Sequence, residues 1–194
     1  MPRDGRIVRE RLRRAAYELF AERGFDATTT EQIAARAGVT ERTYFRHFPD
    51  KREVLFASEE ELRELTVAAL AAVPSDTEPM PALQVAFHAA VPLIERNRPT
   101  TEMLGPIIAV TPALLERQHA KAASLVALVT QALEGRGVSE RTAVLCARVG
   151  MDAFSTAIRR WMPGVSDLHD DLDESFEELK ALSASIGTQQ SSAR

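Results

Sequence analysis

The sequence predicts an all-α fold in which a small N-terminal domain of three helices precedes a larger helical C-terminal domain. Apolar residues recur three and four positions apart along several long segments, which is the periodicity of amphipathic helices. No segment shows the Val- and Ile-rich alternation that is typical of strands. Glycines and prolines separate the periodic segments, most clearly in PSDTEPMP at residues 74–81, where we expect a linker.

The first helix is expected over residues 7–23, because Leu12, Leu19 and Phe20 share one face. Gly24 suits the end of this helix, since glycine adopts the left-handed backbone of a C-terminal cap without strain.

Residues 28–51, TTTEQIAARAGVTERTYFRHFPDK, predict two short helices joined by a tight turn. Thr29 can cap the first of them, and Gln32 stands three residues later, where it completes a capping box. Gly38 stands where the chain must stop and turn, and Thr40 can cap the next helix. This order predicts a helix-turn-helix, the geometry with which one helix enters the major groove of DNA.

Longer helices should follow over residues 50–73, 81–97, 99–110, 112–133, 139–162 and 168–186. The sequence thus divides into a helix-turn-helix domain at 1–56, a helical domain at 57–187 and a disordered tail at 188–194.

Charge is unevenly distributed along the 194 residues, whose formal net charge is −4. Residues 1–56 hold 12 Lys and Arg against 9 Asp and Glu, a net +3, whereas the remainder holds 12 against 19, a net −7. A basic N-terminal domain fits a protein that presents one end to phosphates. The single cysteine, Cys146, excludes an internal disulfide and any cysteine-rich metal site. With no signal-peptide pattern and no long apolar run, we expect a cytoplasmic protein without membrane contact.

Residues 8–55 resemble the N-terminal domain of the TetR-type (tetracycline-repressor-like) transcriptional regulators. The residues that carry the resemblance are Ala15-Ala16, Leu19-Phe20, Gly24-Phe25, Ile33-Ala34, Ala37-Gly38-Val39, Thr43-Tyr44-Phe45, His47-Phe48, Lys51 and Val54-Leu55. The resemblance implies a homodimer that binds a pseudo-palindromic operator in double-stranded DNA. It also implies a C-terminal domain that dimerises through a four-helix bundle and binds a small effector.

The residues that the resemblance places at DNA are Thr28, Thr29, Thr30, Glu41, Arg42, Thr43, Arg46, His47 and Lys51. Arg42 is the leading candidate for base readout, because a guanidinium can bind guanine O6 and N7 together. His47 is either a pH-sensitive phosphate ligand or a packed ring. Phe45 replaces a tyrosine that many members of the family carry, so its phosphate-binding hydroxyl is lost. Tyr44 is expected to be a core residue.

The C-terminal domain holds candidates for an effector pocket and for a dimer interface. The expected pocket, for a hydrophobic or amphipathic molecule such as an acyl-CoA, is lined by Phe87, His88, Val91, Met103, Leu104, Ile107, Ile108, Leu115, His119, Ala123 and Val126. The expected dimer interface is formed by Val144, Val149, Phe154, Ile158, Trp161, Leu172, Phe176 and Leu179. Core packing is the alternative for both sets.

Two other functions stay open. In one, the C-terminal domain binds a partner protein instead of a small molecule; in the other, the chain is a small helical enzyme. The enzyme is least favoured, because no phosphate-binding loop or nucleophile motif is present and no cofactor is expected. His169 lies among acidic residues at a helix start, but no second histidine stands at ligand spacing, so no metal is expected.

Overall fold

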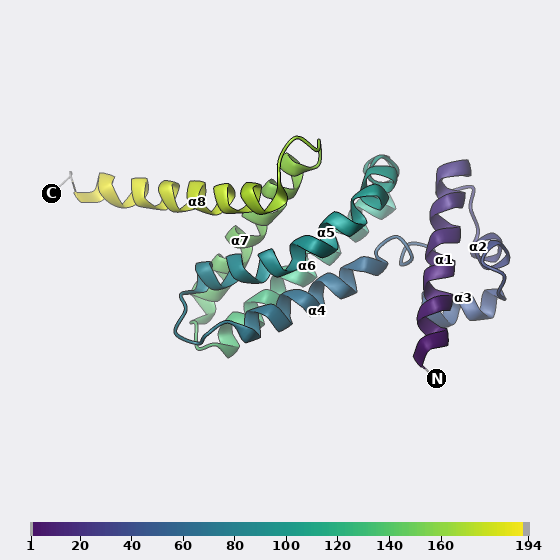
Figure 1. Ribbon diagram of the computed structural model, residues 1–194, viewed down its shortest axis with the longest axis horizontal. Helices are drawn as coiled ribbons and strands as arrows, with labels where there is room; N and C mark the ends of the chain where they lie inside the picture. Colours follow the sequence, from purple (N-terminus) through teal and green to yellow (C-terminus); the bar gives the residue numbers. More distant parts are fainter. Residues whose placement is uncertain (1, 192–194) are drawn as a thin grey trace. The chain divides into compact units, whose positions relative to one another are not determined.

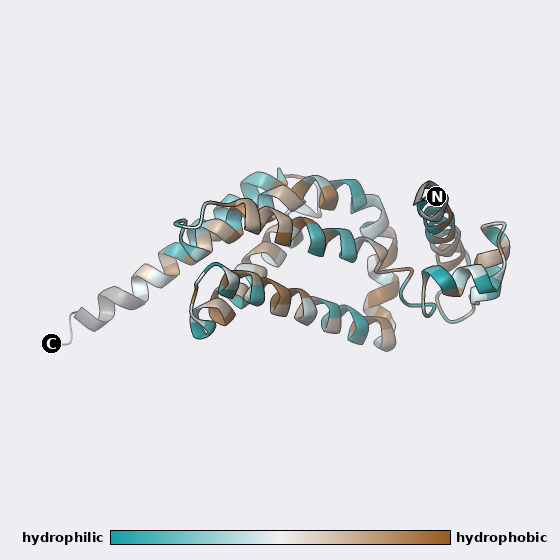
Figure 2. Cartoon of the chain, turned by 90° about the horizontal axis from the view of Figure 1, so that it is seen from below, coloured by the Kyte–Doolittle hydropathy of each residue, from teal (hydrophilic) through white to brown (hydrophobic). Residues whose placement is uncertain are grey.

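The computed structural model describes residues 2–191, and this part of the chain is all-α, as predicted (Figure 1). Its eight helices are α1 Pro2–Arg23, α2 Thr30–Arg36, α3 Glu41–His47, α4 Ala57–Ala72, α5 Pro79–Val110, α6 Pro112–Gly135, α7 Glu140–Trp161 and α8 Leu168–Ser191. Hydrophobic and hydrophilic stretches alternate along the longer helices (Figure 2), so each helix can bury one face.

The chain forms two compact units. Unit 1 comprises Met1–Glu61 and Asn97–Ala122, and unit 2 comprises Leu62–Arg96 and Ala123–Arg194. Unit 1 therefore contains the helix-turn-helix and also the end of α5 and the start of α6, which the sequence had assigned to the C-terminal domain. The assignment of separate functions to residues 1–56 and 57–187 stays a prediction.

The core of unit 1 joins helices α1, α2 and α3 to the segment from α5 and α6. Its fully buried members include Leu12, Phe20, Ile33, Tyr44, Phe48, Val54, Leu104 and Leu114. Burial of each such side chain contributes roughly 1.5–3 kcal/mol. Two leucines that lie far away in the sequence, Leu104 and Leu114, thus complete the core formed by the apolar faces of α1, α2 and α3.

The turns of unit 1 follow the predicted signals. Gly24 and Gly38 adopt φ values of 82° and 67°, the left-handed region that favours glycine. Thr29 accepts the backbone N–H of Gln32, whose side chain accepts the N–H of Thr29, so the predicted capping box is confirmed. Thr40 caps α3 by accepting the N–H of Thr43 at 3.2 Å.

Unit 2 is centred on stacked aromatic rings. Phe87 of α5 lies parallel to Phe154 of α7, with ring centroids 4.6 Å apart, and also contacts Phe176 of α8. Gly150 permits this close approach, because a Cβ there would lie 3.0 Å from Leu83 Cδ1. At the other end, the Arg136 guanidinium donates hydrogen bonds to carbonyl oxygens at the end of α4, including Leu70 O at 3.0 Å. The core of unit 2 is therefore formed by contacts between helices that are far apart in the sequence.

Several predicted helix boundaries were wrong. The first helix begins at Pro2 instead of residue 7, and α5 begins at Pro79, inside the expected linker. The helix expected to begin at residue 50 begins at Ala57, because residues 51–56 form turns that let Val54, Leu55 and Phe56 all be buried. The two helices expected over 81–97 and 99–110 are one helix, α5. Its three internal prolines are solvent-exposed, where freed carbonyl oxygens can bind water, and its apolar face continues past them. The last helix extends to Ser191 instead of residue 186. Of the predicted disordered tail, residues 192–194 lie outside the described residues.

Candidate DNA-binding surface and effector cavity

The helix-turn-helix is held by a hydrogen bond between α2 and α3 and by a second one from α1. The Thr30 hydroxyl at the start of α2 donates to Glu41 Oε1 at the start of α3, at 2.6 Å. Arg11 of α1 donates to the carbonyl oxygen of Ala37, directly beside the Gly38 turn. These contacts fix how α3 leaves the turn.

One face of α3 is exposed and carries two arginines. Arg42 and Arg46 are four residues apart and therefore point to the same side of the helix. Both are exposed, and neither forms an ion pair with another residue in the described part of the chain. Phe45 lies between them with 49% of its surface exposed. We call Arg42, Phe45 and Arg46 the α3 face; it offers two guanidinium groups and one apolar ring to a partner.

The remaining predicted contacts on α2 and α3 are partly engaged within unit 1. Thr29 accepts the Gln32 N–H as a helix cap, and Thr30 donates to Glu41. The Thr43 hydroxyl lies 3.0 Å from that of Thr40. These residues are solvent-exposed or half-buried, so their polar atoms still lie at the surface of unit 1.

Thr28 and Lys51 are placed differently from the expectation. Thr28 is 1% exposed, and its hydroxyl donates to Gly24 O at 2.9 Å. The Lys51 ammonium donates to Phe25 O and Thr28 O, at 2.7 and 2.9 Å, and lies over the Phe25 ring. Burial lowers the pKa of Lys51. Both side chains thus close the loop between α1 and α2 instead of facing solvent.

His47 is packed against positive charge. Its Nε2 atom is buried without a hydrogen-bond partner, and Arg9 donates to its carbonyl oxygen at 2.9 Å. Burial, followed by the charges of Arg46 and Arg9, lowers the pKa of His47 from 6.5. The imidazole is therefore neutral at pH 7, which favours the packed-ring alternative over a cationic phosphate ligand.

Tyr44 is a core residue, as expected. It is fully buried, and its hydroxyl donates to Asp50 O at 3.1 Å. Burial is the main cause that raises the pKa of this hydroxyl. Tyr44 therefore cannot supply the phosphate contact that Phe45 has lost.

The residues expected to line one effector pocket are divided between the two units. Phe87, His88, Val91, Ala123 and Val126 belong to unit 2. Met103, Leu104, Ile107, Ile108, Leu115 and His119 belong to unit 1, where Leu104 lies in the core. Phe87 and Val91 are likewise fully buried in the core of unit 2. Leu104 is therefore a core residue of unit 1, and Phe87 and Val91 are core residues of unit 2. These three side chains do not line one shared pocket.

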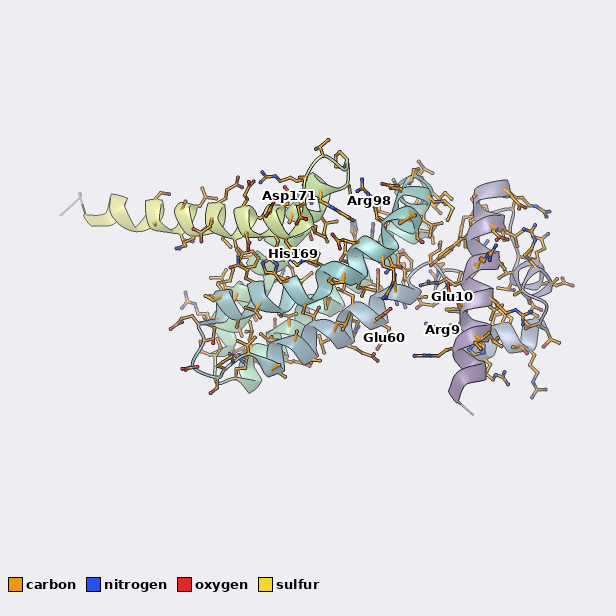
Figure 3. All side chains as sticks on the ribbon, viewed as in Figure 1. Arg9, Glu10, Glu60, Arg98, His169 and Asp171 are labelled. Carbon is orange, nitrogen blue, oxygen red and sulfur yellow. The ribbon has the colours of Figure 1, made fainter. Side chains whose placement is uncertain are left out.

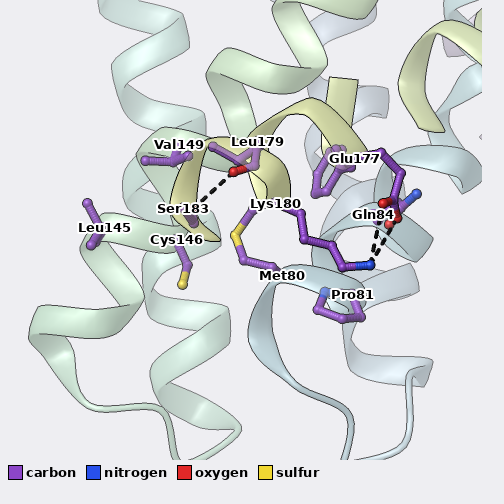
Figure 4. A pocket seen from close by; sticks show the side chains of 11 residues that line it. Met80, Pro81, Gln84, Leu145, Cys146, Val149, Glu177, Leu179, Lys180 and Ser183 are labelled. Carbon is purple, nitrogen blue, oxygen red and sulfur yellow. Dashed lines mark hydrogen bonds and ion pairs between the residues drawn. The ribbon is translucent and has the colours of Figure 1, made fainter. Parts of the chain in front are cut away.

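A cavity of about 510 Å³ lies elsewhere in unit 2, between the start of α5, α7 and α8 (Figure 4). Its apolar lining includes Met80, Leu145, Cys146, Val149 and Leu179. None of the eleven expected pocket residues is among its lining residues. The sequence gives no signal for this cavity, because its walls come from three helices that periodicity alone does not bring together.

The expected dimer-interface residues divide into two classes. Phe154, Trp161, Leu172 and Phe176 are buried in the core of unit 2. Val144 is 37% exposed, and Val149, Ile158 and Leu179 are half-buried. Leu145 and Leu182, which were not predicted, are 62% and 63% exposed on α7 and α8. The apolar surface that these helices offer to a second copy therefore differs from the predicted set.

A pair of histidines that sequence reasoning missed links α5 to α8. His88 Nδ1 lies 2.7 Å from His169 Nδ1, and His88 Nε2 lies 2.7 Å from Asp173 Oδ1. The hydrogen bond from His88 holds the pKa of Asp173 below its usual range. His169 stands near the start of α8 (Figure 3), 81 residues from His88, so spacing could not reveal the pair. Among the described residues, no group of three or more His, Cys, Asp or Glu has the arrangement of a metal site.

Comparison with known proteins identifies the N-terminal region. Residues 12–58 match the profile of the bacterial regulatory proteins of the tetR family. The regulator TcmR of Streptomyces glaucescens is 41% identical over 86 residues, which are 44% of this chain and 38% of TcmR. The first curated relatives are thus matched over less than two fifths of their length.

Two solved structures resemble nearly the whole chain. SmeT of Stenotrophomonas maltophilia in complex with triclosan is 25% identical, with a TM-score of 0.59 over 88% of this chain and 90% of SmeT. Thermus thermophilus FadR, a repressor in complex with lauroyl-CoA, is 28% identical, with a TM-score of 0.52 over 87% of this chain and 91% of FadR.

No helix in the described part of the chain is both long and apolar enough to cross a membrane. The helix-turn-helix, the all-α fold and these similarities lead to one assignment. Residues 12–58 are a DNA-binding region of the tetR family of bacterial regulatory proteins, and the described part of the chain has the all-α fold of TetR-family transcriptional regulators.

Proposed function

We propose that this chain is a homodimeric, sequence-specific repressor that a hydrophobic or amphipathic small molecule releases from its operator. The observation that carries the DNA-binding part is the α3 face, on which Arg42 and Arg46 are exposed and unpaired among the described residues. An arginine pair spaced by one helical turn can meet a base edge and a neighbouring phosphate in the major groove. Action on DNA also implies a cytoplasmic location.

The role proposed for each residue at DNA follows from the exposure of its side chain and from the hydrogen bonds that it makes within unit 1. Arg42 reads a base, and Arg46 contacts a base or a phosphate. Thr29, Thr30 and Thr43 position the unit through phosphate contacts, because their polar atoms lie at the surface of unit 1. Lys51 supports the α1–α2 loop through its two carbonyl contacts and reaches a phosphate only if it leaves them.

We expect a dimer because a single helix-turn-helix contacts only a short stretch of DNA. One α3 face touches too few bases for useful affinity, so two copies read the half-sites of a pseudo-palindrome. The exposed apolar residues Val144, Leu145 and Leu182 make α7 and α8 the preferred contact between copies.

The ligand-responsive part is supported by the cavity in unit 2 and by the relatives. A volume of about 510 Å³ lies within the range of small-molecule pockets. SmeT is known in complex with triclosan and FadR with lauroyl-CoA. An acyl-CoA is one candidate effector, and binding of a partner protein by unit 2 is the alternative that the cavity disfavours.

The first experiment is to incubate the purified protein with fragmented DNA from its own genome at about 150 mM salt, where binding through phosphates alone is weak. We expect recovery of a discrete pseudo-palindrome, bound by two chains per site. Uniform recovery of unrelated fragments, with binding that simply declines as salt rises, would contradict sequence-specific regulation. A reporter under the recovered site then separates repression from activation.

A further inference from the structure

Four side chains from α5 and α8 form one hydrogen-bonded group in unit 2, which we call the histidine cluster. Gln84 and His88 are four residues apart on α5, so they lie on one face of that helix. His169 and Asp173 have the same spacing on α8 (Figure 3 labels His169). Gln84 Nε2 and His88 Nε2 each lie 2.7 Å from Asp173 Oδ1. His88 Nδ1 lies 2.7 Å from His169 Nδ1, which completes the cluster.

The two imidazole rings meet edge to edge. Their planes differ by 10° and their centroids are 5.0 Å apart, whereas the two Nδ1 atoms are only 2.7 Å apart. Both nitrogens therefore lie between the centroids and point at each other within the ring planes. This in-line arrangement is the one that a hydrogen bond prefers. It leaves no room for a metal ion between the nitrogens, because zinc requires about 2.0–2.1 Å to each of them.

Asp173 determines which nitrogen of His88 carries a proton. The hydrogen bond from His88 holds the pKa of Asp173 below its usual range, so this carboxylate is ionised at neutral pH and only accepts hydrogen bonds. His88 therefore donates from Nε2. In a neutral His88 the Nδ1 atom is then an acceptor, so His169 must donate from its own Nδ1. The hydrogen bonds thus run in one direction, from His169 through His88 to Asp173.

The pair of rings can take up one proton without losing its contact. A proton from solvent binds His169 Nε2 while the proton on His169 Nδ1 passes to His88 Nδ1, so one N–H still lies between the rings. The hydrogen bonds that His88 donates are then charge-assisted, which makes them stronger. A second proton would place an N–H on both inner nitrogens and bring two positive rings together. The contact would then break, because like charges repel strongly at this distance.

The charges of α5 and α8 beside the pair are negative. Between residues 79 and 94, His88 is the only charged or titratable residue of α5. On α8, Asp170 follows His169 in the sequence, and Asp167 Oδ1 accepts the backbone N–H of His169 at 2.8 Å. The first proton therefore enters a region of opposite charge.

The third helix that packs against this end of α8 is α7, and its nearby cation is already paired. Arg160 of α7 forms ion pairs with three carboxylates of α8, at 3.6, 2.6 and 3.4 Å: Asp171, Glu174 and Glu178. These ion pairs do not involve the histidine cluster. They keep the start of α8 on α7 whether or not the two imidazoles are in contact.

We infer that the histidine cluster is a pH-sensitive connection between α5 and α8, strengthened by the first proton that it binds and broken between the two rings by the second. The inference goes beyond the proposed function and depends neither on DNA nor on a small-molecule effector. After the second proton binds, His169 leaves His88, while Gln84 and His88 remain bonded to Asp173. The response is therefore a local change at the first turn of α8 and not an unfolding of unit 2.

Nuclear magnetic resonance of the natural chain, labelled with ¹⁵N in its four histidines, tests the arrangement of protons without any variant. At about pH 8, where histidine is ordinarily neutral, we expect the proton of His88 on Nε2 and that of His169 on Nδ1. The exposed His119 of unit 1 is the internal reference for a ring in solvent. A proton on Nε2 of both His88 and His169 would overturn the inference, because two bare nitrogens would then face each other.

A double-mutant cycle measures how the contact depends on pH. His88→Gln, His169→Gln and the double variant are unfolded in urea, followed by Trp161 of unit 2. The coupling should be about three- to tenfold in the unfolding equilibrium at about pH 7, and within about twofold of none at about pH 4.5. Asp173, whose pKa is lowered from 3.8, stays ionised over this range. A coupling that is absent at pH 7, or constant over the range, would overturn the inference.

Controls within the chain separate this connection from general effects of substitution. His119→Gln combined with His88→Gln should show no coupling at either pH, because residue 119 belongs to unit 1. Asp173→Asn should make both tautomers of His88 visible at about pH 8, since an amide can donate as well as accept. Glu174→Gln, which alters the neighbouring carboxylate that pairs with Arg160, should leave the His88 signal unchanged. Equal effects of the two substitutions on that signal would overturn the role of Asp173.

Two further outcomes are distinguishable. A coupling between His88 and His169 that a chelator abolishes and added Zn²⁺ restores would identify a metal site and overturn the pH-sensitive connection. Failure of the chain to retain a discrete operator, with the coupling and its pH dependence intact, would overturn the proposed function and leave the connection standing.

Discussion

Both compact units have an apolar core, but they differ in how many side chains hydrogen-bond to the backbone where the chain bends. In unit 1, side chains donate hydrogen bonds to backbone carbonyl oxygens at each bend of the chain: Lys51 to the α1–α2 loop, Arg11 to Ala37, and Tyr44 to Asp50. In unit 2, the main feature is the contact between apolar faces, with Phe87 stacked on Phe154. Its prominent side-chain-to-backbone contact is Arg136, at the end of α4.

This difference fits the tasks proposed for the two units. Hydrogen bonds are directional, so many of them hold the α3 face in one orientation, as base recognition requires. Apolar contacts are not directional, and an apolar core can border a cavity and exchange protein contacts for ligand contacts. Unit 1 is therefore suited to reading a fixed pattern, and unit 2 to adjusting to a ligand.

The largest expected effect tests whether α5 contributes to unit 1. Leu104→Ala should destabilise unit 1 by ~2–5 kcal/mol, because it removes a leucine that is 2% exposed among residues of α1 and the turns before α4. Urea unfolding can follow each unit by itself, since both tyrosines, Tyr17 and Tyr44, lie in unit 1 and the single tryptophan, Trp161, lies in unit 2.

The tyrosine signal should shift to lower urea more than the tryptophan signal. Met103→Ala is the matched control. Met103 adjoins Leu104 in the sequence, but its side chain is 39% exposed, so its removal should destabilise unit 1 far less. A shift confined to the tryptophan signal would show that residue 104 belongs to the core of unit 2.

The next effect concerns the α3 face. Arg42→Ala should weaken operator binding by ~1–3 kcal/mol and relax the preference at one base position, since it removes a bidentate base contact. Arg42→Lys keeps the positive charge but loses the two parallel N–H donors of the guanidinium. It should therefore restore charge-dependent affinity for DNA without restoring the preference for one base. Titration of the operator and of single-base variants of it measures both. If Arg42→Ala weakened all sequences equally, Arg42 would be a phosphate contact.

A smaller effect compares two turn glycines of unit 1. A Cβ atom at Gly38 would meet a neighbouring side chain, whereas a Cβ atom at Gly24 would meet none. Gly38→Ala places a Cβ 2.7 Å from Arg11 Nη2 at a φ of 67°, so it combines backbone strain with loss of the Arg11 contact to Ala37. The strain alone costs about 1–2 kcal/mol. Gly24→Ala has the same strain at a φ of 82° with nothing within 4 Å. Thermal unfolding should therefore show a greater loss for Gly38→Ala, and equal losses would mean that the Arg11 contact contributes nothing.

The sequence could predict most of unit 1 because its signals are local. The cap residues Thr29 and Thr40 and the turn glycine Gly38 act within four residues of their partners, and all three are confirmed. A local signal of the same kind is present in unit 2, where Ser139 caps α7 by accepting the backbone N–H of Thr142. Where structure depends on neighbours in space, prediction failed: exposed prolines did not interrupt α5, because its buried face continues past them.

The candidate site shows the same limit. The positions of Arg42 and Arg46 on one face follow from helical spacing alone. The burial of Thr28 and the carbonyl contacts of Lys51 depend on how the α1–α2 loop closes, and no spacing rule encodes that. In unit 2, the cavity and the His88–His169 pair each join helices that are far apart in the sequence.

The smallest expected effect is the pH dependence that His47 gives to unit 1. Its pKa is lowered in the folded state, so below about 6.5 the unfolded chain binds a proton that the folded chain resists. The stability contributed by the neutral ring is therefore full above pH 6.5 and is lost as the pH falls through the folded pKa. Urea unfolding followed by the tyrosine signal should show this slope in the natural chain and not in His47→Gln, whose side chain does not titrate. Asp50, whose pKa is lowered from 3.8, acts only at lower pH and is common to both proteins. Because Arg9 and Arg46 repel the imidazolium, Arg9→Gln should reduce the slope without removing it, and an unchanged slope in His47→Gln would assign the pH dependence to another group.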